Sequence, residues 1–192
     1  MFMIDIETLG SREDSVILSL ACIYFDPTQK PSPDQLRKDC FFIKFDVKDQ
    51  VENYKRKIQK DTIEWWNKQC DLAKKKSFVR KSTDVSLIDG IQQFKLWVSE
   101  KDTNKKDWIW ARGSLDEFVL KSVESQLNVE PTFTYNRWRD VRTAIDLLYN
   151  QTNGYCKVNY DGFDASLNII KHNPIDDCVF DIMMLLYGEE NE

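Results

Sequence analysis

The sequence feature that most limits how this chain can fold is a pair of carboxylates on one face of an apolar strand. Residues 2–7 (FMIDIE) alternate between apolar side chains and others, and Gly10 ends the stretch, which is the period of a β-strand. Because side chains two residues apart in a strand point to the same face, Asp5 and Glu7 project side by side. Like charges repel each other, and burial raises the pKa of a carboxyl group. The pair therefore predicts either a bound cation or an edge strand whose polar face lies in water.

The length and composition predict one globular domain over residues 1–192. Hydrophobic residues make up 42% of the sequence and aromatic residues 12%, which is enough for a substantial core. No apolar run approaches the ~20 residues that a membrane span needs, and the acidic residue at position 5 argues against a signal peptide. Five scattered cysteines without a C-x-x-C pair are typical of reduced thiols in a cytoplasmic protein.

The charge and the histidine content exclude two classes of protein. A net charge of −5 argues against a protein that binds nucleic acid by electrostatics alone, but it permits a nucleic-acid enzyme with divalent cations in its active site. His172 is the one histidine of the sequence, so a zinc site built on several histidines is excluded. Any catalysis by histidine would involve this residue.

The hydrophobic pattern predicts three strands first, and then strands and helices in alternation. We expect strands at residues 2–7, 16–25, 40–45, 108–111 and 133–135. We expect helices that begin at Asp61 and Asp84, and further helices at 116–127, 140–149, 165–171 and 174–186. Residues 28–34 and the strongly basic residues 74–81 are expected to be loops, and residues 49–60 form a polar segment. This order is typical of an α/β fold with flanking helices and a mixed sheet whose first strands are antiparallel.

Other carboxylates stand where later strands end or helices begin. Asp116 lies in the first turn of a helix that follows a strand and a glycine turn. Open α/β sheets bind ligands at such a place, although an acid there is also favoured by the helix dipole alone. Asp177 lies one turn into a helix that begins near Pro174, and His172 directly precedes that helix, so the two side chains can face a common point. Asp140 is interpreted as a helix-capping acid.

The order of these residues resembles that of the DEDDh 3′→5′ exonuclease superfamily, and more narrowly the exonuclease A group of T-even phages. The resemblance rests on Asp5-x-Glu7-Thr8, on Asp116, and on His172 followed five positions later by Asp177. Further matching stretches are Thr62-Ile63-Glu64-Trp65-Trp66, Trp110-Ala111-Arg112-Gly113, Arg139-Asp140-Val141-Arg142-Thr143, Asp161-Gly162-Phe163 and residues 172–184. The resemblance spans nearly the whole chain, and it implies a ribonuclease H-like fold with a mixed central sheet.

The resemblance also implies a metal-dependent exonuclease that releases 5′-mononucleotides from the free 3′ end of single-stranded DNA. Four acids, Asp5, Glu7, Asp116 and Asp177, would bind two Mg²⁺ or Mn²⁺ ions, which prefer carboxylate oxygens. His172 would be the general base, a role that its ordinary pKa near 6.5 suits. Thr8 and Leu9, which follow the first two acids, would contact the terminal nucleotide.

Basic and aromatic residues provide candidates for the rest of the substrate site. Arg112, Arg139, Arg142 and the basic residues of 74–81 are candidate phosphate contacts. Trp65, Trp66, Trp110 and Trp138 can stack on bases, although tryptophan more often packs in a core. Two alternative functions remain at this point: an exoribonuclease with the same chemistry, and a ribonuclease H-like binding module without catalysis, against which the complete set of acids argues.

Overall fold

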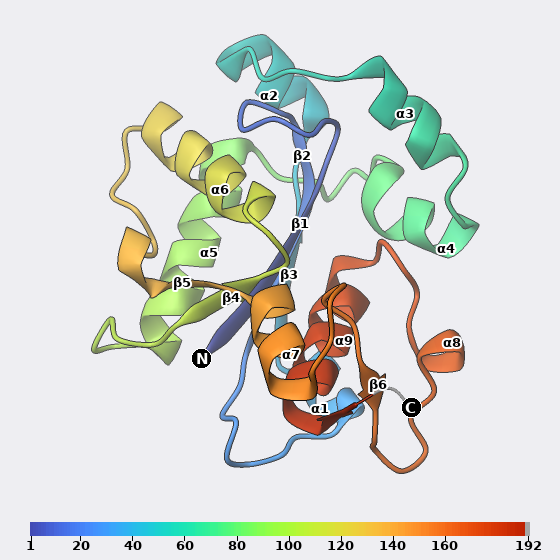
Figure 1. Ribbon diagram of the computed structural model, residues 1–192. Helices are drawn as coiled ribbons and strands as arrows, with labels where there is room; N and C mark the ends of the chain where they lie inside the picture. Colours follow the sequence, from blue (N-terminus) through green and yellow to red (C-terminus); the bar gives the residue numbers. More distant parts are fainter. Residues whose placement is uncertain (191–192) are drawn as a thin grey trace.

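The centre of the protein is a five-stranded mixed sheet, as the computed structural model describes it for residues 1–190 (Figure 1). The strand order is β3-β2-β1-β4-β5. The strands are β1 (Phe2–Thr8), β2 (Ile17–Tyr24), β3 (Cys40–Lys44), β4 (Ile109–Ala111) and β5 (Trp138–Asp140). The pairs β1·β2 and β2·β3 are antiparallel, whereas β1·β4 and β4·β5 are parallel. The predicted α/β class and the antiparallel start of the sheet are therefore confirmed.

Helices cover both faces of this sheet, and the alternation in β1 decides which side chain faces which layer. On one face α5 (Leu87–Lys101) and α6 (Leu115–Gln126) enclose a core with Phe2, Ile4 and Ile6. On the other face lie α1 (Pro33–Lys38), α7 (Val141–Tyr149) and α9 (Pro174–Tyr187), and their core includes Met3. Because strand side chains alternate, Asp5 and Glu7 belong to the face that α9 covers.

Short elements complete the fold around the edges of the sheet. They are α2 (Val47–Tyr54), α3 (Lys60–Asn67), α4 (Asp71–Ala73), the π-helix η1 (Lys74–Phe78), the 3₁₀ turn η2 (Tyr135–Arg137), β6 (Lys157–Val158), α8 (Ala165–Asn168) and β7 (Gly188–Glu189). The helix α3 is joined to the end of β1, because the indole Nε1 of Trp66 donates to the Thr8 carbonyl at 3.0 Å. Trp66 is completely buried beside Leu9 in a third apolar cluster.

The strand predicted at residues 133–135 is wrong, and the structure places a strand five residues later. Phe133 is buried, but Tyr135 is 81% exposed and begins the 3₁₀ turn η2. The strand β5 at Trp138–Asp140 pairs instead with β4. Arg137 fixes this register, because its guanidinium donates to the carboxylate of Asp102 and to the carbonyl of Asp107.

The starts of two helices also differ from the prediction. The helix expected from Asp84 begins at Leu87, because Ser86 is the N-cap and its hydroxyl accepts from the Asp89 N–H. Asp84 instead lies 3.7 Å from the ammonium group of Lys44. The helix expected from Asp61 begins one residue earlier, at Lys60. The predicted capping role of Asp140 is confirmed, since its carboxylate accepts from the Arg142 N–H at the start of α7.

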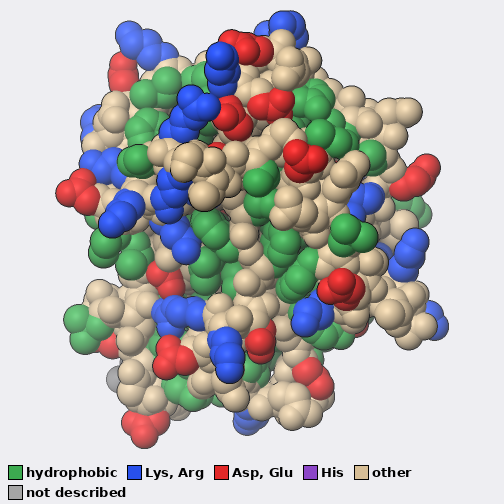
Figure 2. All heavy atoms as spheres, turned by 180° about the vertical axis from the view of Figure 1, so that it is seen from behind, with side chains coloured by type: hydrophobic (Ala, Val, Ile, Leu, Met, Phe, Trp, Pro, Cys, Tyr) green, Lys and Arg blue, Asp and Glu red, His purple; other side chains and the backbone are tan. Residues whose placement is uncertain are grey.

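The two segments that were expected to be loops contain short helices, α1 within and after 28–34 and α4 with η1 around 74–81. The polar segment 49–60 overlaps α2, which begins before it at Val47. Ser32 and Gln35 form a complete capping box at the start of α1, and such a box stabilises even a short helix. Figure 2 shows the face opposite to that of Figure 1, where Lys and Arg side chains gather on the side that carries α3 and α4.

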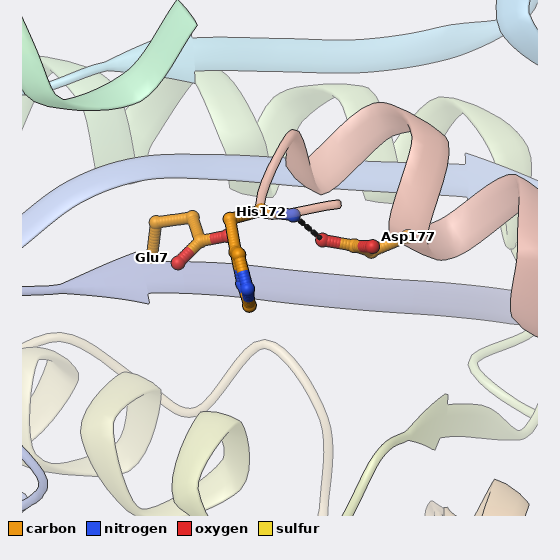
Figure 3. A group of neighbouring side chains, drawn as sticks. All are labelled: Glu7, His172 and Asp177. Carbon is orange, nitrogen blue, oxygen red and sulfur yellow. Dashed lines mark hydrogen bonds between the residues drawn. The ribbon is translucent and has the colours of Figure 1, made fainter. Parts of the chain in front are cut away.

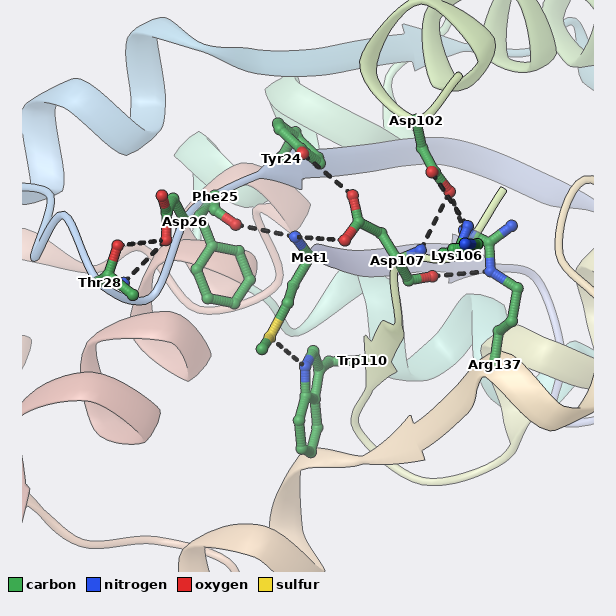
Figure 4. Close-up of polar contacts among 10 residues, drawn as sticks. All are labelled: Met1, Tyr24, Phe25, Asp26, Thr28, Asp102, Lys106, Asp107, Trp110 and Arg137. Atoms are coloured by element: carbon green, nitrogen blue, oxygen red, sulfur yellow. Dashed lines mark hydrogen bonds and ion pairs between the residues drawn. The ribbon is translucent and has the colours of Figure 1, made fainter. Parts of the chain in front are cut away.

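A buried polar network closes the end of the sheet at which β4 begins. Arg137 is ion-paired with Asp102, and the Tyr24 hydroxyl donates to Asp107 at 3.0 Å (Figure 4). Asp102 and Asp107 of this network precede β4 in the chain, so the network is at the end of the strand remote from Asp116. Within residues 1–190, no helix combines the length and the hydropathy that crossing a membrane requires.

Candidate active site

The strand β1 places two carboxylates beside each other near its C-terminal end. Asp5 and Glu7 are two residues apart in β1, and each is partly buried. The pairing with β2 is irregular between Glu7 and Thr8, and such an irregularity bends a strand and redirects its side chains. The prediction that Asp5 and Glu7 project from one face of the strand is consistent with this geometry.

Asp116 lies at the start of α6, and its carboxylate contacts the neighbouring strand β1. It lies in the first turn of α6, directly after β4 and the turn at Gly113, and only 6% of the residue is exposed. Its Oδ1 accepts from the backbone N–H of Ile6 at 3.1 Å. That N–H lies between Asp5 and Glu7 in the chain, so the bond brings Asp116 against the carboxylate pair.

His172 and Asp177 approach the same point from the start of α9. The backbone of His172 has a left-handed conformation with a φ of 63°, which a non-glycine residue adopts rarely. Its N–H donates to Oδ2 of Asp177 at 2.9 Å. One ligand atom from each of Glu7, His172 and Asp177 lies within 4.8 Å of the others (Figure 3).

A cleft of 330 Å³ opens over these groups, and its lining includes most of the predicted site. The lining residues are Asp5, Glu7, Arg112, Tyr155, Lys171, His172, Asp177, Phe180 and Asp181. The structure therefore brings Asp5, Glu7, His172 and Asp177 together at one cleft, and Asp116 is bonded to the Ile6 N–H between the first two of them. Their roles in binding and catalysis remain predictions.

The cleft raises the proton affinity of its carboxylates. Burial is the largest cause in each case, and the neighbouring negative charges add to it. The pKa of Asp5 is raised well above its ordinary value by burial and by Glu7, Asp177, Asp116 and Asp181. Burial and the neighbouring acids raise the pKa of Glu7 to about 8, and burial raises the pKa of Asp116 and of Asp177 to about 7.

The His172 imidazole has the opposite shift. Burial, together with the charge of Lys171, lowers its pKa below 6.5, so the ring is mainly neutral at pH 7 and can accept a proton. Trp65 packs against it edge-on with the ring centroids 4.6 Å apart, and Trp66 lies 6.5 Å away. These aromatic rings restrict the orientation of the imidazole.

The donor set fits a divalent cation. Oδ2 of Asp5 is buried without a hydrogen-bond partner among the described residues, and an unpaired buried carboxylate oxygen is costly. The groups around it are carboxylates and one imidazole, and hard cations such as Mg²⁺ and Mn²⁺ prefer carboxylate oxygens. Asp5, Glu7, Asp116 and Asp177 are the residues that would hold such ions.

Asp181 is a fifth carboxylate of the cleft that the sequence analysis missed. It lies one turn after Asp177 on α9 and is 7% exposed. The guanidinium of Arg112 donates to it from Nη2 at 2.6 Å and from Nε at 3.0 Å. A signal was present in the sequence, because Asp181 interrupts the apolar run 178–186 (CVFDIMMLL) on the helical face that carries Asp177.

Three of the four predicted substrate contacts do not line the cleft. The Thr8 hydroxyl donates to the Gly10 carbonyl at 2.5 Å, and Leu9 is 4% exposed in an apolar cluster. Arg139 lies over the Trp108 ring at 4.7 Å and donates to two backbone carbonyls. Arg112 does line the cleft. Contact of any of the four with substrate remains a prediction.

Of the other basic and aromatic candidates, some contact other protein side chains, one lies beside His172, and one is buried in the core. Arg142 is ion-paired with Asp140, and Lys76 lies over the Phe42 ring. Trp65 is 40% exposed beside His172, and it is therefore the tryptophan whose position best suits contact with a base. Trp66 is fully buried, so it packs in the core.

The raised pKa values predict that the metal-free protein loses stability as the pH rises. Glu7, Asp116 and Asp177 bind protons more tightly in the folded than in the unfolded state. The free energy of unfolding therefore falls as the pH rises from about 4 to about 8. His172, with its lowered pKa, opposes this trend as a single group.

Thermal unfolding in EDTA at pH 5.5 and pH 8 measures this effect. We expect a midpoint several degrees higher at pH 5.5, since about 1 kcal/mol corresponds to roughly 2–4 °C for a chain of this length. The Asp5→Asn protein should show a smaller difference, because one of the repelling charges is gone. An equal or larger difference in that variant would contradict the electrostatic explanation.

Comparison with known proteins agrees with this geometry. The family described as "3'-5' exoribonuclease Rv2179c-like domain" matches residues 1–187. The chain is 34% identical over 209 residues to the exodeoxyribonuclease of Enterobacteria phage T4, and the match covers 97% of this chain and 88% of the phage protein.

A solved structure shares the fold. It is the nuclease domain of 3'hExo, described as a DEDDh family member bound to rAMP. The TM-score is 0.59 at 12% sequence identity, and the match covers 100% of this chain and 96% of that one. The predicted ribonuclease H-like architecture is therefore confirmed.

Proposed function

This chain belongs to the DEDDh 3′-5′ exonucleases, and from that premise we propose that it hydrolyses single-stranded DNA from the free 3′ end and releases 5′-mononucleotides. The observation that supports this most directly is the convergence of Asp5, Glu7, His172 and Asp177 on one cleft, with Asp116 bonded to the strand beneath it. The preference for DNA follows the phage relative, which is similar along nearly the whole chain.

The proposed mechanism assigns the proton transfer to His172. Divalent cations, when bound by the four acids, would supply stabilisation of the negative charge that develops on the phosphate. The imidazole, neutral at pH 7, accepts the proton of the water that attacks the terminal phosphodiester. The bond to the 3′ oxygen of the penultimate nucleotide then breaks, and the terminal nucleotide leaves with its 5′ phosphate.

The neighbours of His172 assist this role by position. Trp65 packs against one side of the imidazole, and the backbone N–H of His172 is fixed by Asp177. A ring that is restrained before the substrate arrives loses less entropy in the reaction. The cleft lining also includes the aromatic rings of Tyr155 and Phe180, which can contact an apolar part of the substrate.

Digestion of end-labelled substrates tests the direction and the nucleic acid. With Mg²⁺ or Mn²⁺, we expect 3′-labelled single-stranded DNA to release labelled mononucleotide at once, whereas 5′-labelled DNA shortens stepwise. A circular single strand should remain intact, because it offers no 3′ end. Cleavage of the circle would show an endonuclease and contradict the proposal.

A matched RNA decides between the proposal and its closest alternative. The family description names exoribonucleases, so an RNA of the same sequence is digested in parallel. We expect kcat/KM to be higher for the DNA. Faster digestion of the RNA would reverse the assignment of substrate while leaving the 3′→5′ chemistry intact, and no digestion of either would favour a binding module without catalysis.

A further inference from the structure

Arg112 and Asp181 form a closed ion pair inside the cleft. Nε of Arg112 donates to both carboxylate oxygens of Asp181, at 3.0 and 3.3 Å, and Nη2 donates to Oδ1 at 2.6 Å. Nη1 donates to the Gly154 carbonyl at 3.0 Å, and the guanidinium lies 4.2 Å from the centre of the Tyr155 ring. Each donor nitrogen of the Arg112 fork thus has a partner within the protein, so the fork is not directed at a phosphate.

The pair joins the two segments that supply the predicted acids. Arg112 directly follows β4 and precedes Asp116 by four residues, and Asp181 follows Asp177 by one turn of α9. An arginine paired through two nitrogens has a fixed geometry. A change in this pair would therefore alter the positions of both Asp116 and Asp177.

The charges of the cleft explain why such a pair is needed. Five carboxylates gather there: Asp5, Glu7, Asp116, Asp177 and Asp181. Asp181 lies one turn after Asp177 on α9 and lines the same cleft as Asp5 and Glu7, so its charge acts on the space between the other acids. Two divalent cations balance four negative charges, and the fifth needs a different partner.

We propose that Arg112 is a positioning residue that neutralises Asp181, so that the four remaining carboxylates alone set the affinity of the cleft for divalent cations. This inference rests on the proposed function, because it assumes that those four acids bind the metal. It assigns to Arg112 a role inside the protein instead of the phosphate contact that the sequence suggested. It also separates Asp181, which is paired, from Asp5, whose Oδ2 is unpaired among the described residues.

Binding of Mn²⁺ measured by calorimetry tests the inference without reference to activity. In the Asp181→Asn protein the charge of Arg112 remains, because arginine does not lose its proton in proteins. We expect that uncompensated positive charge to weaken Mn²⁺ binding by about tenfold. The double variant Asp181→Asn, Arg112→Gln removes both charges, and its Kd should return to within about threefold of the wild-type value.

The remaining variants make the result specific. The Arg112→Gln protein should bind Mn²⁺ at least as tightly as the wild type and the double variant, and this comparison remains available if Asp181→Asn alone does not fold. The matched control is the buried pair of Arg137 and Asp102 at the other end of β4 (Figure 4). Asp102→Asn should lower the thermal midpoint and leave the Kd for Mn²⁺ unchanged.

Three outcomes would overturn the inference. An unchanged Kd in a folded Asp181→Asn protein would make the pair purely structural. A weakened Kd that the double variant does not restore would make Asp181 itself a metal ligand. Weaker Mn²⁺ binding by Arg112→Gln than by the wild type would give Arg112 some other role. Failure of the wild type to bind Mn²⁺ is a distinct result, because it would remove the metal from the proposed function as well.

Discussion

The Asp5→Asn protein is expected to fold and to lose at least about 10³-fold in exonuclease rate. Asp5 carries the buried, unpartnered carboxylate oxygen of the cleft, as far as the described residues show. Removing one metal ligand should cost several kcal/mol of transition-state stabilisation, and each 1.4 kcal/mol is a factor of ten in rate. Asparagine has the shape of aspartate, so no cavity is created.

Three measurements on the same protein make this prediction decisive. Nucleotide release from labelled single-stranded DNA gives the rate, calorimetry gives Mn²⁺ binding, and thermal unfolding in EDTA gives the stability. We expect lost activity, weaker binding of Mn²⁺, and an unchanged or higher midpoint at pH 8, because a repelling charge is gone. The control is Glu100→Gln, which neutralises an exposed acid on α5, a helix on the face of the sheet opposite to α9. A folded Asp5→Asn protein with normal turnover would refute the assignment of Asp5.

Replacement of His172 is expected to lower the rate by about 10²–10⁴-fold, the usual range for general acid–base catalysis. The backbone of His172 is left-handed, and asparagine tolerates that conformation better than most residues. His172→Asn is therefore the preferred variant, and His172→Ala is its companion. Both should retain Mn²⁺ binding, because the four acids are intact.

The pH profile of the wild type gives an independent check on His172. Burial lowers the pKa of the imidazole below 6.5, so the activity of a histidine base should rise with pH and reach its plateau near or below neutral pH. The His172→Asn protein should lack this rise. Near-normal turnover at pH 7.5 by a folded His172→Asn protein would remove the imidazole from the mechanism and leave the residue with a structural role in the turn before α9.

Much of the fold could be predicted from local patterns, and the misplaced strand has a cause that is not local. The strand β1 and the strand at Trp108–Ala111 were recognisable because their periodicity or apolar run is strong. The strand predicted at 133–135 was wrong because Phe133 and Tyr135 resemble an alternating strand, whereas the contacts of Arg137 with Asp102 and Asp107 set the true register. Those contacts join residues about 30 positions apart in the chain, and no local pattern records them.

The site likewise has residues that local sequence patterns predict and contacts that depend on long-range packing. Asp5, Glu7, Asp116, His172 and Asp177 stand at places where strands end or helices begin, so sequence order and spacing were sufficient to propose them. The pairing of Arg112 with Asp181 depends on how β4 and α9 approach each other in space. Likewise, burial of Leu9 beside Trp66 became visible only with the packing of α3 against the end of β1.

The position of α9 against β1 has a consequence for the order of synthesis. Cys178 and Met3 are in contact although 175 positions separate them in the chain; Asp177 belongs to the same late helix, and His172 lies just before it. A ribosome releases β1 first, so Asp5 and Glu7 emerge long before the residues that would complete the cleft. Docking of α9 against β1 joins segments that are very far apart in the chain, and closing so long a loop costs conformational entropy. The nuclease would thus remain harmless to nearby nucleic acid until α9 has been made and docked, and a fragment that ends before His172 would be inert.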